Sequence, residues 1–280
     1  MTSPQPRRKF RNLQGRLPSG SADTVPRRPT GVGRAALAAY RNAPLGTRLH
    51  ATIRWWSAPF PAVETELPRT GRVLEIGCGH GLFCTYAALA GPARTVHGVD
   101  IDRAKIALAA GVASRLSGLN LDFDVATSGA VVAGPWDAIV IIDMLYLLPA
   151  NEQHELLAAA AAQLAPGGVL LIKEMSATPR WKARWNAFQE TLSVSILGIT
   201  ERAGTGSVDD PARPRFDFVG TDVLAGWLSE LGLSPTGRRL DHRRLHPHHL
   251  LIGKRPDPGG QATRNTPAMT ENRTGLDESQ

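Results

Sequence analysis

The sequence predicts an α/β fold built on a mostly parallel sheet with helices on both faces. Between residues 72 and 172, short apolar runs alternate with longer helical stretches, which is the pattern of strand–helix–strand units. The first run leads directly into a cluster of glycines, as expected for a tight turn between a buried strand and a helix. The last two apolar runs lie close enough in sequence to pair antiparallel.

The parallel strands are predicted from short apolar runs bounded by turn residues, because strands buried on both faces of a sheet are nearly continuously apolar. In chain order these runs are Arg72–Ile76, Thr95–Val99, Leu119–Val125, Ala138–Ile142 and Gly168–Ile172.

Helices are predicted between these strands. The stretch His80–Ala90 is rich in Ala and Leu. In the next helix, Asp102–Leu116, Asp102 is the expected N-cap and an apolar face begins at Ile106. A third helix, Asn151–Leu164, has Asn151 as its expected cap.

The pattern changes in the C-terminal part. A long helix is predicted over Pro179–Leu197, followed by a Gly/Asp/Pro-rich loop over residues 198–220 and a helix over Thr221–Leu231. Two final strands, Pro235–Leu240 and His249–Lys254, complete the sheet as an antiparallel pair.

The basic charge of the chain is concentrated near its N-terminus. The net charge of +7 divides into +10 for residues 1–54, −2 for residues 55–254 and −1 for residues 255–280. We expect a disordered basic tail over residues 1–44, an ordered domain over 45–255 and a disordered tail over 256–280, because both ends are rich in Pro, Gly and polar residues. The Arg-rich start also has some features of an organellar transit peptide, although its Pro and Gly content argues against one.

Cellular location is predicted from what the composition excludes. Two cysteines cannot build a disulfide scaffold, and no apolar run is long enough for a membrane span or a secretory signal. We therefore expect a cytoplasmic protein.

The glycine turn predicts a ligand site. Gly77, Gly79 and Gly81 follow the first strand in a G-x-G-x-G pattern, which differs from the G-x-G-x-x-G of dinucleotide sites. Asp100 follows the second strand, where an acidic side chain can accept both hydroxyls of a ribose. Glu75, inside the first strand, lies beside the expected position of a cationic amino-acid group.

The segments VLEIGCGHGLF, VHGVDID, WDAIVIIDMLYLLP and LAPGGVLLIKE occur in this order. Together they resemble the motifs of class I S-adenosylmethionine-dependent methyltransferases, over about residues 50–255. The resemblance implies a Rossmann-like seven-stranded sheet of order 3-2-1-4-5-7-6 with its last strand antiparallel. It also implies S-adenosyl-L-methionine as the cofactor. A non-catalytic relative of the family is disfavoured by the intact glycine turn and Asp100.

The resemblance assigns roles to the residues at this edge of the sheet. Backbone atoms of the glycine turn line the methionine and ribose, Glu75 lies near the methionine amino group, Asp100 binds the ribose and Ile101 packs on adenine. Two residues ending the fourth strand face the sulfonium and the acceptor. The resulting cofactor residues are Glu75, Gly77, Cys78, Gly79, Gly81, Asp100, Ile101, Thr127, Asp143 and Met144.

Thr127 marks a departure from the family, which often has Asp at this position to bind the adenine amino group. Thr127, Ser128 or a backbone carbonyl could take the place of that Asp. A register slip that brings Asp124 to the site is the alternative.

The acceptor class is narrowed by what the motifs lack. The fourth strand ends Asp143-Met144-Leu145-Tyr146 rather than in the Asn/Asp-Pro-Pro-Tyr of enzymes that methylate amide or base nitrogens. Both cysteines lie in or beside the glycine turn, which disfavours cytosine methylation. No metal-ligand set is present, and none is expected. We predict a small-molecule or lipid-like acceptor methylated on oxygen or carbon, with an RNA acceptor recruited by the basic tail as the alternative.

Two aromatic segments are candidates for the acceptor pocket. Trp55 and Trp56 precede the first strand and could cover the site or pack on the domain edge. Trp181 and Trp185 share one face of the predicted helix 179–197, which could be core, pocket wall or a surface in peripheral contact with a membrane. The oligomeric state stays open.

Four residues are candidates for orienting or deprotonating the acceptor. His246 and His248 lie in the turn before the last strand, which an antiparallel strand brings to the active edge, although they could equally form a solvated turn. Glu174 and Tyr146 follow the fifth and fourth strands.

Overall fold

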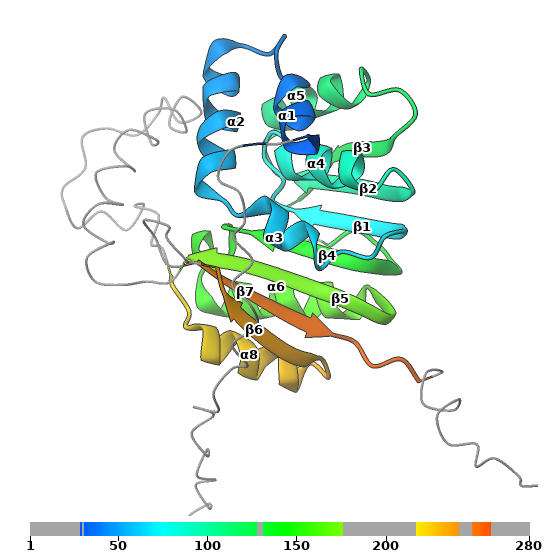
Figure 1. Cartoon of the computed structure of the whole chain (residues 1–280). Helices are drawn as coiled ribbons and strands as arrows, with labels where there is room; N and C mark the ends of the chain where they lie inside the picture. The colour runs from blue at the N-terminus through cyan, green and yellow to red at the C-terminus, as the bar shows by residue number, and fades with distance from the viewer. Residues whose placement is uncertain (1–28, 30, 128–130, 176–216, 241–247, 259–280) are drawn as a thin grey trace, which may run out of the picture.

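The computed structural model describes residues 29, 31–127, 131–175, 217–240 and 248–258, which form one twisted sheet with helices on both faces (Figure 1). The strands are β1 Gly71–Ile76, β2 Arg94–Asp100, β3 Asn120–Val125, β4 Trp136–Ile142, β5 Leu164–Met175, β6 Ser234–Arg239 and β7 His248–Lys254. They form a seven-stranded sheet of order β3-β2-β1-β4-β5-β7-β6, so the predicted order is confirmed.

Strand directions also agree with the prediction. β1 pairs in parallel with β2 and β4, whereas β7 is antiparallel to both β5 and β6. The carboxyl ends of β1, β2, β4 and β5 and the start of β7 therefore meet at one edge of the sheet, where ligands bind in open α/β sheets.

Helices precede, connect and follow the strands. They are α1 Val32–Ala38, α2 Leu45–Ser57, α3 Phe60–Glu64, α4 Leu82–Ala90, α5 Arg103–Ala113, the short 3₁₀ helix η1 Leu145–Leu147, α6 Ala150–Ala162 and α8 Thr221–Glu230. The predicted cap of α5 is confirmed, since the Asp102 carboxylate accepts the N–H groups of Ala104 at 3.0 Å and Lys105 at 3.1 Å.

The predicted cap of α6 is wrong. Pro149 occupies the N-cap position and Asn151 lies within the first turn. The N–H of Ala150 is instead bonded by the Asp217 carboxylate at 3.1 Å, from a segment distant in sequence. A tertiary contact here replaces the local capping bond.

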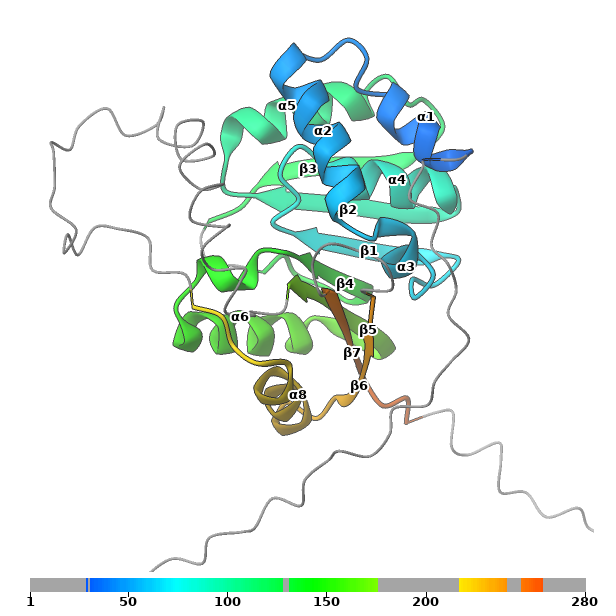
Figure 2. The ribbon, with the colours of Figure 1, turned by 60° about the vertical axis from the view of Figure 1, so that its left-hand side comes forward.

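The core lies on both faces of the sheet, as alternation along β4 shows. Ala138, Val140 and Ile142 pack with residues of α1 to α5, whereas Ile139 and Ile141 pack with α6 and α8. Figures 1 and 2 show these two helical layers on either side of the strands.

The N-terminal boundary of the domain differs from the prediction. Residues 32–38 form α1, and Tyr40 is 1% exposed and donates its hydroxyl hydrogen to the His80 carbonyl at 2.7 Å. Gly33 packs against the Trp55 ring so closely that a Cβ there would lie 2.4 Å from it. Residues 32–44 are therefore part of the folded domain, not of a disordered tail.

Other predicted segments fall outside the described residues. They are the tail over residues 1–28, the helix 179–197, most of the loop 198–220 and the end of the chain from residue 259. Within the part that is described, no helix is both long and apolar enough to cross a membrane.

Candidate active site

The turn after β1 is held in a conformation that favours glycine. Gly77, Gly79 and Gly81 have φ angles of 76°, 55° and 74°, in the left-handed region that residues with a Cβ adopt at a cost. The N–H groups of Gly77 and Cys78 both donate to the carbonyl of Val99 on β2, at 2.8 and 3.0 Å. The turn is therefore anchored to the neighbouring strand.

The three glycines have different surroundings. A Cβ on Gly81 would lie 2.5 Å from the Phe123 ring and 3.0 Å from Ala109, so this glycine allows α4 to pack closely on the sheet. A Cβ on Gly77 would lie 2.8 Å from the Met144 side chain. Around Gly79 no atom lies within 4 Å of that position. The open side of the turn is thus at Gly79, and Gly81, expected to line the cofactor, is placed against the core.

Asp100 connects the end of β2 to this turn. One carboxylate oxygen accepts the Gly79 N–H at 2.8 Å and the other accepts the Asp102 N–H at 2.9 Å. Each carboxylate oxygen can accept a further hydrogen bond, and the side chain is only half-buried. Asp100 can therefore position the turn and still accept the hydroxyls of a ribose.

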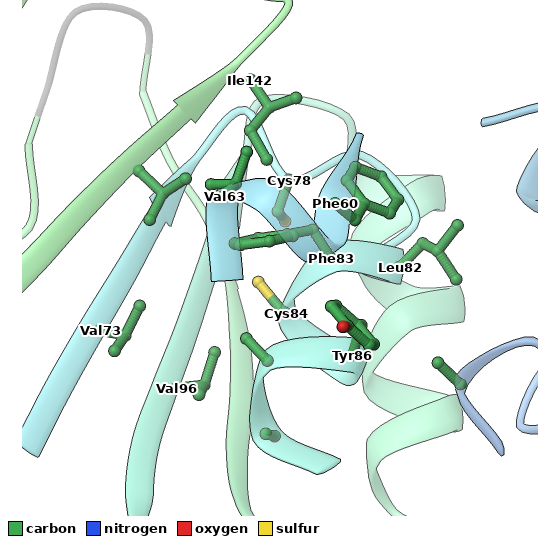
Figure 3. Close-up of a cluster of buried hydrophobic side chains, with 14 of the residues drawn as sticks. Phe60, Val63, Val73, Cys78, Leu82, Phe83, Cys84, Tyr86, Val96 and Ile142 are labelled. Atoms are coloured by element: carbon green, nitrogen blue, oxygen red, sulfur yellow. The ribbon is translucent and has the colours of Figure 1, made fainter. Parts of the chain in front are cut away.

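Glu75 is a buried acid inside β1, with 4% of its surface exposed. The Cys84 thiol donates to its Oε2 at 2.8 Å, and Figure 3 shows Cys84 on α4 pointing toward the strands. Burial raises the pKa of Glu75 to about 8 and that of the Cys84 thiol well above its usual value. Within the described part of the chain, no basic side chain forms an ion pair with Glu75.

A second cluster of charges joins α2 to the ends of β4 and β5. Asp143, which has a φ of 51°, accepts hydrogen bonds from Arg54 Nη1 at 2.7 Å and from Lys173 Nζ at 2.6 Å. Burial alone would raise the pKa of Asp143, but the charges of Lys173 and Arg54 lower it to about 2. Asp143 therefore stays ionised and bound to both cations.

Glu174, at the end of β5, is chemically different from Asp143. Its Oε1 accepts the N–H groups of Met144 at 3.2 Å and Leu145 at 3.0 Å. Burial, followed by the negative charge of Asp143, raises the pKa of Glu174 to about 8. Since Met144 also packs on Gly77, this acid lies one residue away from the glycine turn.

A pocket lies between α2 and the glycine turn. From α2 it is lined by His50, Ala51 and Arg54, and the His50 ring lies 4.9 Å from that of His80. The remaining lining residues come from α3, β1, the glycine turn and α4: Phe60, Glu75, Gly77, Cys78, Gly79, His80, Leu82 and Phe83. The structure thus places Glu75, Gly77, Cys78 and Gly79 around one space.

The two tryptophans of α2 lie away from this space. Trp55 is buried and packs edge-on against Tyr86 at 5.1 Å and Phe60 at 5.9 Å. Trp56 is 47% exposed on the outer side of the helix. Of the two expected roles, covering the site or packing on the domain, Trp55 has the second. Neither tryptophan lines the pocket.

Tyr146 and His248 lie at the same edge of the sheet as Glu174. Tyr146 is buried, with its ring stacked on Phe218 at 5.0 Å. His248 begins β7 opposite Met175 of β5 and is 3% exposed. His246, Trp181 and Trp185 lie outside the described residues.

The expected adenine contacts lie at the ends of β2 and β3. Ile101 is 66% exposed immediately after Asp100, and Thr127 is exposed just beyond β3. The β2–β3 register pairs Val99 with Asp124, within the strand, and the Asp124 carboxylate lies 3.6 Å from His97. A register slip that brings Asp124 to the site is therefore excluded.

Sequence reasoning missed Arg54, Lys173 and His50. Arg54 directly precedes Trp55 and Trp56, the residues of this segment that were expected at the acceptor pocket. Lys173 directly follows the apolar run of β5. A lysine in a strand buried on both faces is itself a signal, because an unpaired buried charge is costly. Among the described residues, no group of His, Cys, Asp or Glu is arranged to hold a metal ion.

Comparison with known proteins shows the family to which the chain belongs. A methyltransferase-domain model matches residues 49–235. A ubiquinone biosynthesis O-methyltransferase from Xanthomonas axonopodis is 27% identical over 197 residues, covering 64% of this chain and 75% of that one. A ribosomal protein L11 methyltransferase from Deinococcus radiodurans is 36% identical over 155 residues, covering 50% of each chain.

Solved structures share the fold. An O-methyltransferase family protein from Burkholderia thailandensis superposes with a TM-score of 0.55 at 20% identity, covering 83% of this chain and 66% of that one. Magnesium protoporphyrin IX methyltransferase from Synechocystis, with SAH bound, gives a TM-score of 0.53 at 18% identity, covering 80% of this chain and 95% of that one. Because the family model covers more than half of the sequence and the fold agrees, the chain belongs to the class I S-adenosylmethionine-dependent methyltransferases.

Proposed function

We propose that the enzyme transfers the methyl group of S-adenosylmethionine to a hydroxyl oxygen of a small, largely apolar acceptor. The observation that carries this proposal is Glu174, a buried acid with its pKa raised to about 8 beside the glycine turn. A general base works best when its pKa is near the operating pH. An acceptor hydroxyl needs such a base, because it must lose its proton as the methyl group is transferred.

The cofactor fits the residues present. The open side of Gly79 allows a ligand to approach the backbone, Asp100 has acceptor capacity for ribose hydroxyls, and the buried Glu75 offers a negative partner for an ammonium group. When bound, the cofactor supplies an activated methyl group on a sulfonium. The protein then has to bind the acceptor, orient it toward the methyl group and exclude water.

Toward the acceptor, Glu174 acts as the base and the Tyr146 ring lines the site. When a hydroxyl is the acceptor, Glu174 would take up the hydroxyl proton as the oxygen receives the methyl group that the bound cofactor would supply. Asp143 is unsuited to this role because its carboxylate binds Arg54 and Lys173 and its pKa is about 2. The stacked Tyr146 and Phe218 rings offer a flat aromatic surface near Glu174.

A small acceptor is favoured over RNA for two reasons. The pocket lies between α2 and the glycine turn, a space that suits a small ligand better than a polymer. Residues 55–254 carry a net charge of −2, which gives no broad basic face. The relative from ubiquinone biosynthesis is itself named as an O-methyltransferase. This supports oxygen rather than carbon as the methylated atom.

The test is a screen of the full chain with labelled S-adenosylmethionine and phenols, catechols and their alkylated forms, beside RNA and total protein. We expect label on a ring hydroxyl, with kcat/KM rising toward pH 8. Glu174→Gln should lose most of the turnover while S-adenosylhomocysteine still binds, because an amide oxygen can still accept the two backbone N–H groups. Glu152→Gln, on an exposed position of α6, is the control. Label only on RNA or protein, or full turnover in Glu174→Gln, would overturn the proposal.

A further inference from the structure

The outer face of α2 carries a stripe of exposed apolar side chains, defined by Leu45, Leu49 and Ile53. They are 76%, 60% and 46% exposed, and their spacing of four residues puts them on one side of the helix. Trp56 falls on the same side and is 47% exposed. Of the large apolar side chains exposed in the described part of the chain, α2 holds more than any other element.

The opposite face of α2 packs on the core and lines the pocket. Ala51 and Trp55 are buried in the core, while His50 and Arg54 line the pocket. Figures 1 and 2 show α2 at the outside of the domain, and the exposed fractions place the stripe on its solvent side. Packing against the described residues therefore does not explain these side chains.

The surroundings of the stripe are basic. No acidic residue occurs between Asp23 and Glu64. Within this stretch Arg34, Arg41 and Arg48 are exposed, on α1, after it and on α2. An apolar helix face bordered by arginines is typical of helices that lie in the interface of a negatively charged bilayer.

We propose that α2 is a docking helix for an anionic lipid bilayer, with the stripe inserted among the acyl chains and the arginines at the headgroups. RNA would use the arginines but has no need of Leu45, Leu49 and Ile53, because phosphate contacts are polar. A symmetric dimer through this face would bring two basic surfaces together, with a repulsive cost. A bilayer satisfies both the apolar and the basic parts of the surface.

This docking surface does not depend on the reaction. It lies on the face of α2 opposite the pocket, and binding to lipid can be measured without any acceptor. If the proposed acceptor is also apolar, attachment brings the pocket close to the lipid in which such a molecule dissolves; that consequence alone rests on the proposed function.

The test is flotation of the full chain with phosphatidylcholine vesicles, with and without phosphatidylglycerol. We expect the wild type to float with the anionic vesicles and to be released by salt. The variant L45Q/L49Q/I53Q keeps every charge and should lose at least about tenfold in vesicle affinity, since it removes three inserted side chains. Val223→Gln, at a 45% exposed apolar position on α8, is the control for placing Gln at an exposed apolar site outside the stripe and should float like the wild type.

Several outcomes would overturn the proposal. One is a wild-type protein that does not float with the anionic vesicles. Another is a triple variant that floats as well as the wild type, which would place attachment elsewhere. A triple variant that melts at a clearly lower temperature would show that the stripe is covered within the chain. A wild-type dimer that becomes monomeric in the variant, with flotation unchanged, would identify the stripe as a contact between copies.

Discussion

Affinity for the cofactor should depend on pH through Glu75. Its carboxyl has a pKa of about 8 in the free protein, so only about 1% is ionised at pH 6 and about half at pH 8. If the ionised form is the one that binds the ammonium group of the ligand, the Kd scales inversely with that fraction. The Kd for S-adenosylhomocysteine should therefore fall roughly 50-fold between pH 6 and pH 8.

Titration calorimetry gives two independent readouts of this prediction. At pH 7 the wild type should release about 0.9 protons on binding, detected by comparing buffers of different ionisation enthalpy. Glu75→Gln mimics the protonated acid, so it should bind at every pH at least as weakly as the wild type does at pH 6, without proton release. Asp100→Asn, at the proposed ribose contact, should weaken binding but keep the pH slope. A wild-type Kd that varies less than about threefold over this range, or an unchanged slope in Glu75→Gln, refutes the reasoning.

Three further predictions concern stability. Asp143→Asn keeps a residue type that tolerates a φ of 51° but leaves the buried Lys173 and the partly buried Arg54 without a carboxylate. Urea unfolding should therefore show a loss of about 3–5 kcal/mol, and a loss below about 1 kcal/mol would contradict the pairing. Glu75 and Glu174 both have pKa values raised to about 8, so the stability they contribute is complete below their unfolded value of 4.5 and is lost as pH rises through 8. Wild-type unfolding free energy should therefore decrease from pH 5 to pH 9, and Glu174→Gln should flatten that decrease; a steady increase with pH would exclude it. Gly81→Ala should destabilise the domain by about 1–3 kcal/mol, through its φ and the Phe123 contact. Gly79→Ala, with open space around it, should cost about 1 kcal/mol in stability and weaken S-adenosylhomocysteine binding more than Gly81→Ala does; equal effects of the two on binding would remove the distinction.

The fold was predictable because its signals are local. The strands β1 and β4 and the middle of β5 are short apolar runs, each glycine turn or polar cap lies beside the element it bounds, and the strand order follows from the resemblance to the methyltransferase motifs. The residues proposed for the cofactor could be named for the same reason, since most of them lie at or directly after the ends of β1 and β2 in the sequence. Asp102 illustrates how local these signals are, because it caps α5 by accepting the N–H groups of residues only two and three positions ahead.

What sequence reasoning missed depends on contacts between distant segments. Arg54 and Asp143 are 89 residues apart and meet only after α2 packs across the sheet edge. The capping of α6 by Asp217, and the burial of Gly33 under Trp55, are likewise tertiary. The short helix α1 was assigned to the tail because seven residues give too little periodicity to separate a helix from Pro- and Gly-rich neighbours.

Three buried acids at one sheet edge have different pKa values because their partners differ, and this difference assigns their roles. Asp143 contacts both available cations, Arg54 and Lys173, so it is fixed as an anion that ties α2 to β4 and β5. Glu75 accepts a hydrogen bond from the Cys84 thiol and forms no ion pair among the described residues, which leaves it able to gain stability from a cation supplied by a ligand. Glu174 is bonded to backbone N–H groups and lies near the negative charge of Asp143, so it can gain or lose a proton near neutral pH. Because Asp143 neutralises the cations that would otherwise lower the pKa of Glu174, replacing Asp143 should make Glu174 a weaker base as well as destabilise the domain.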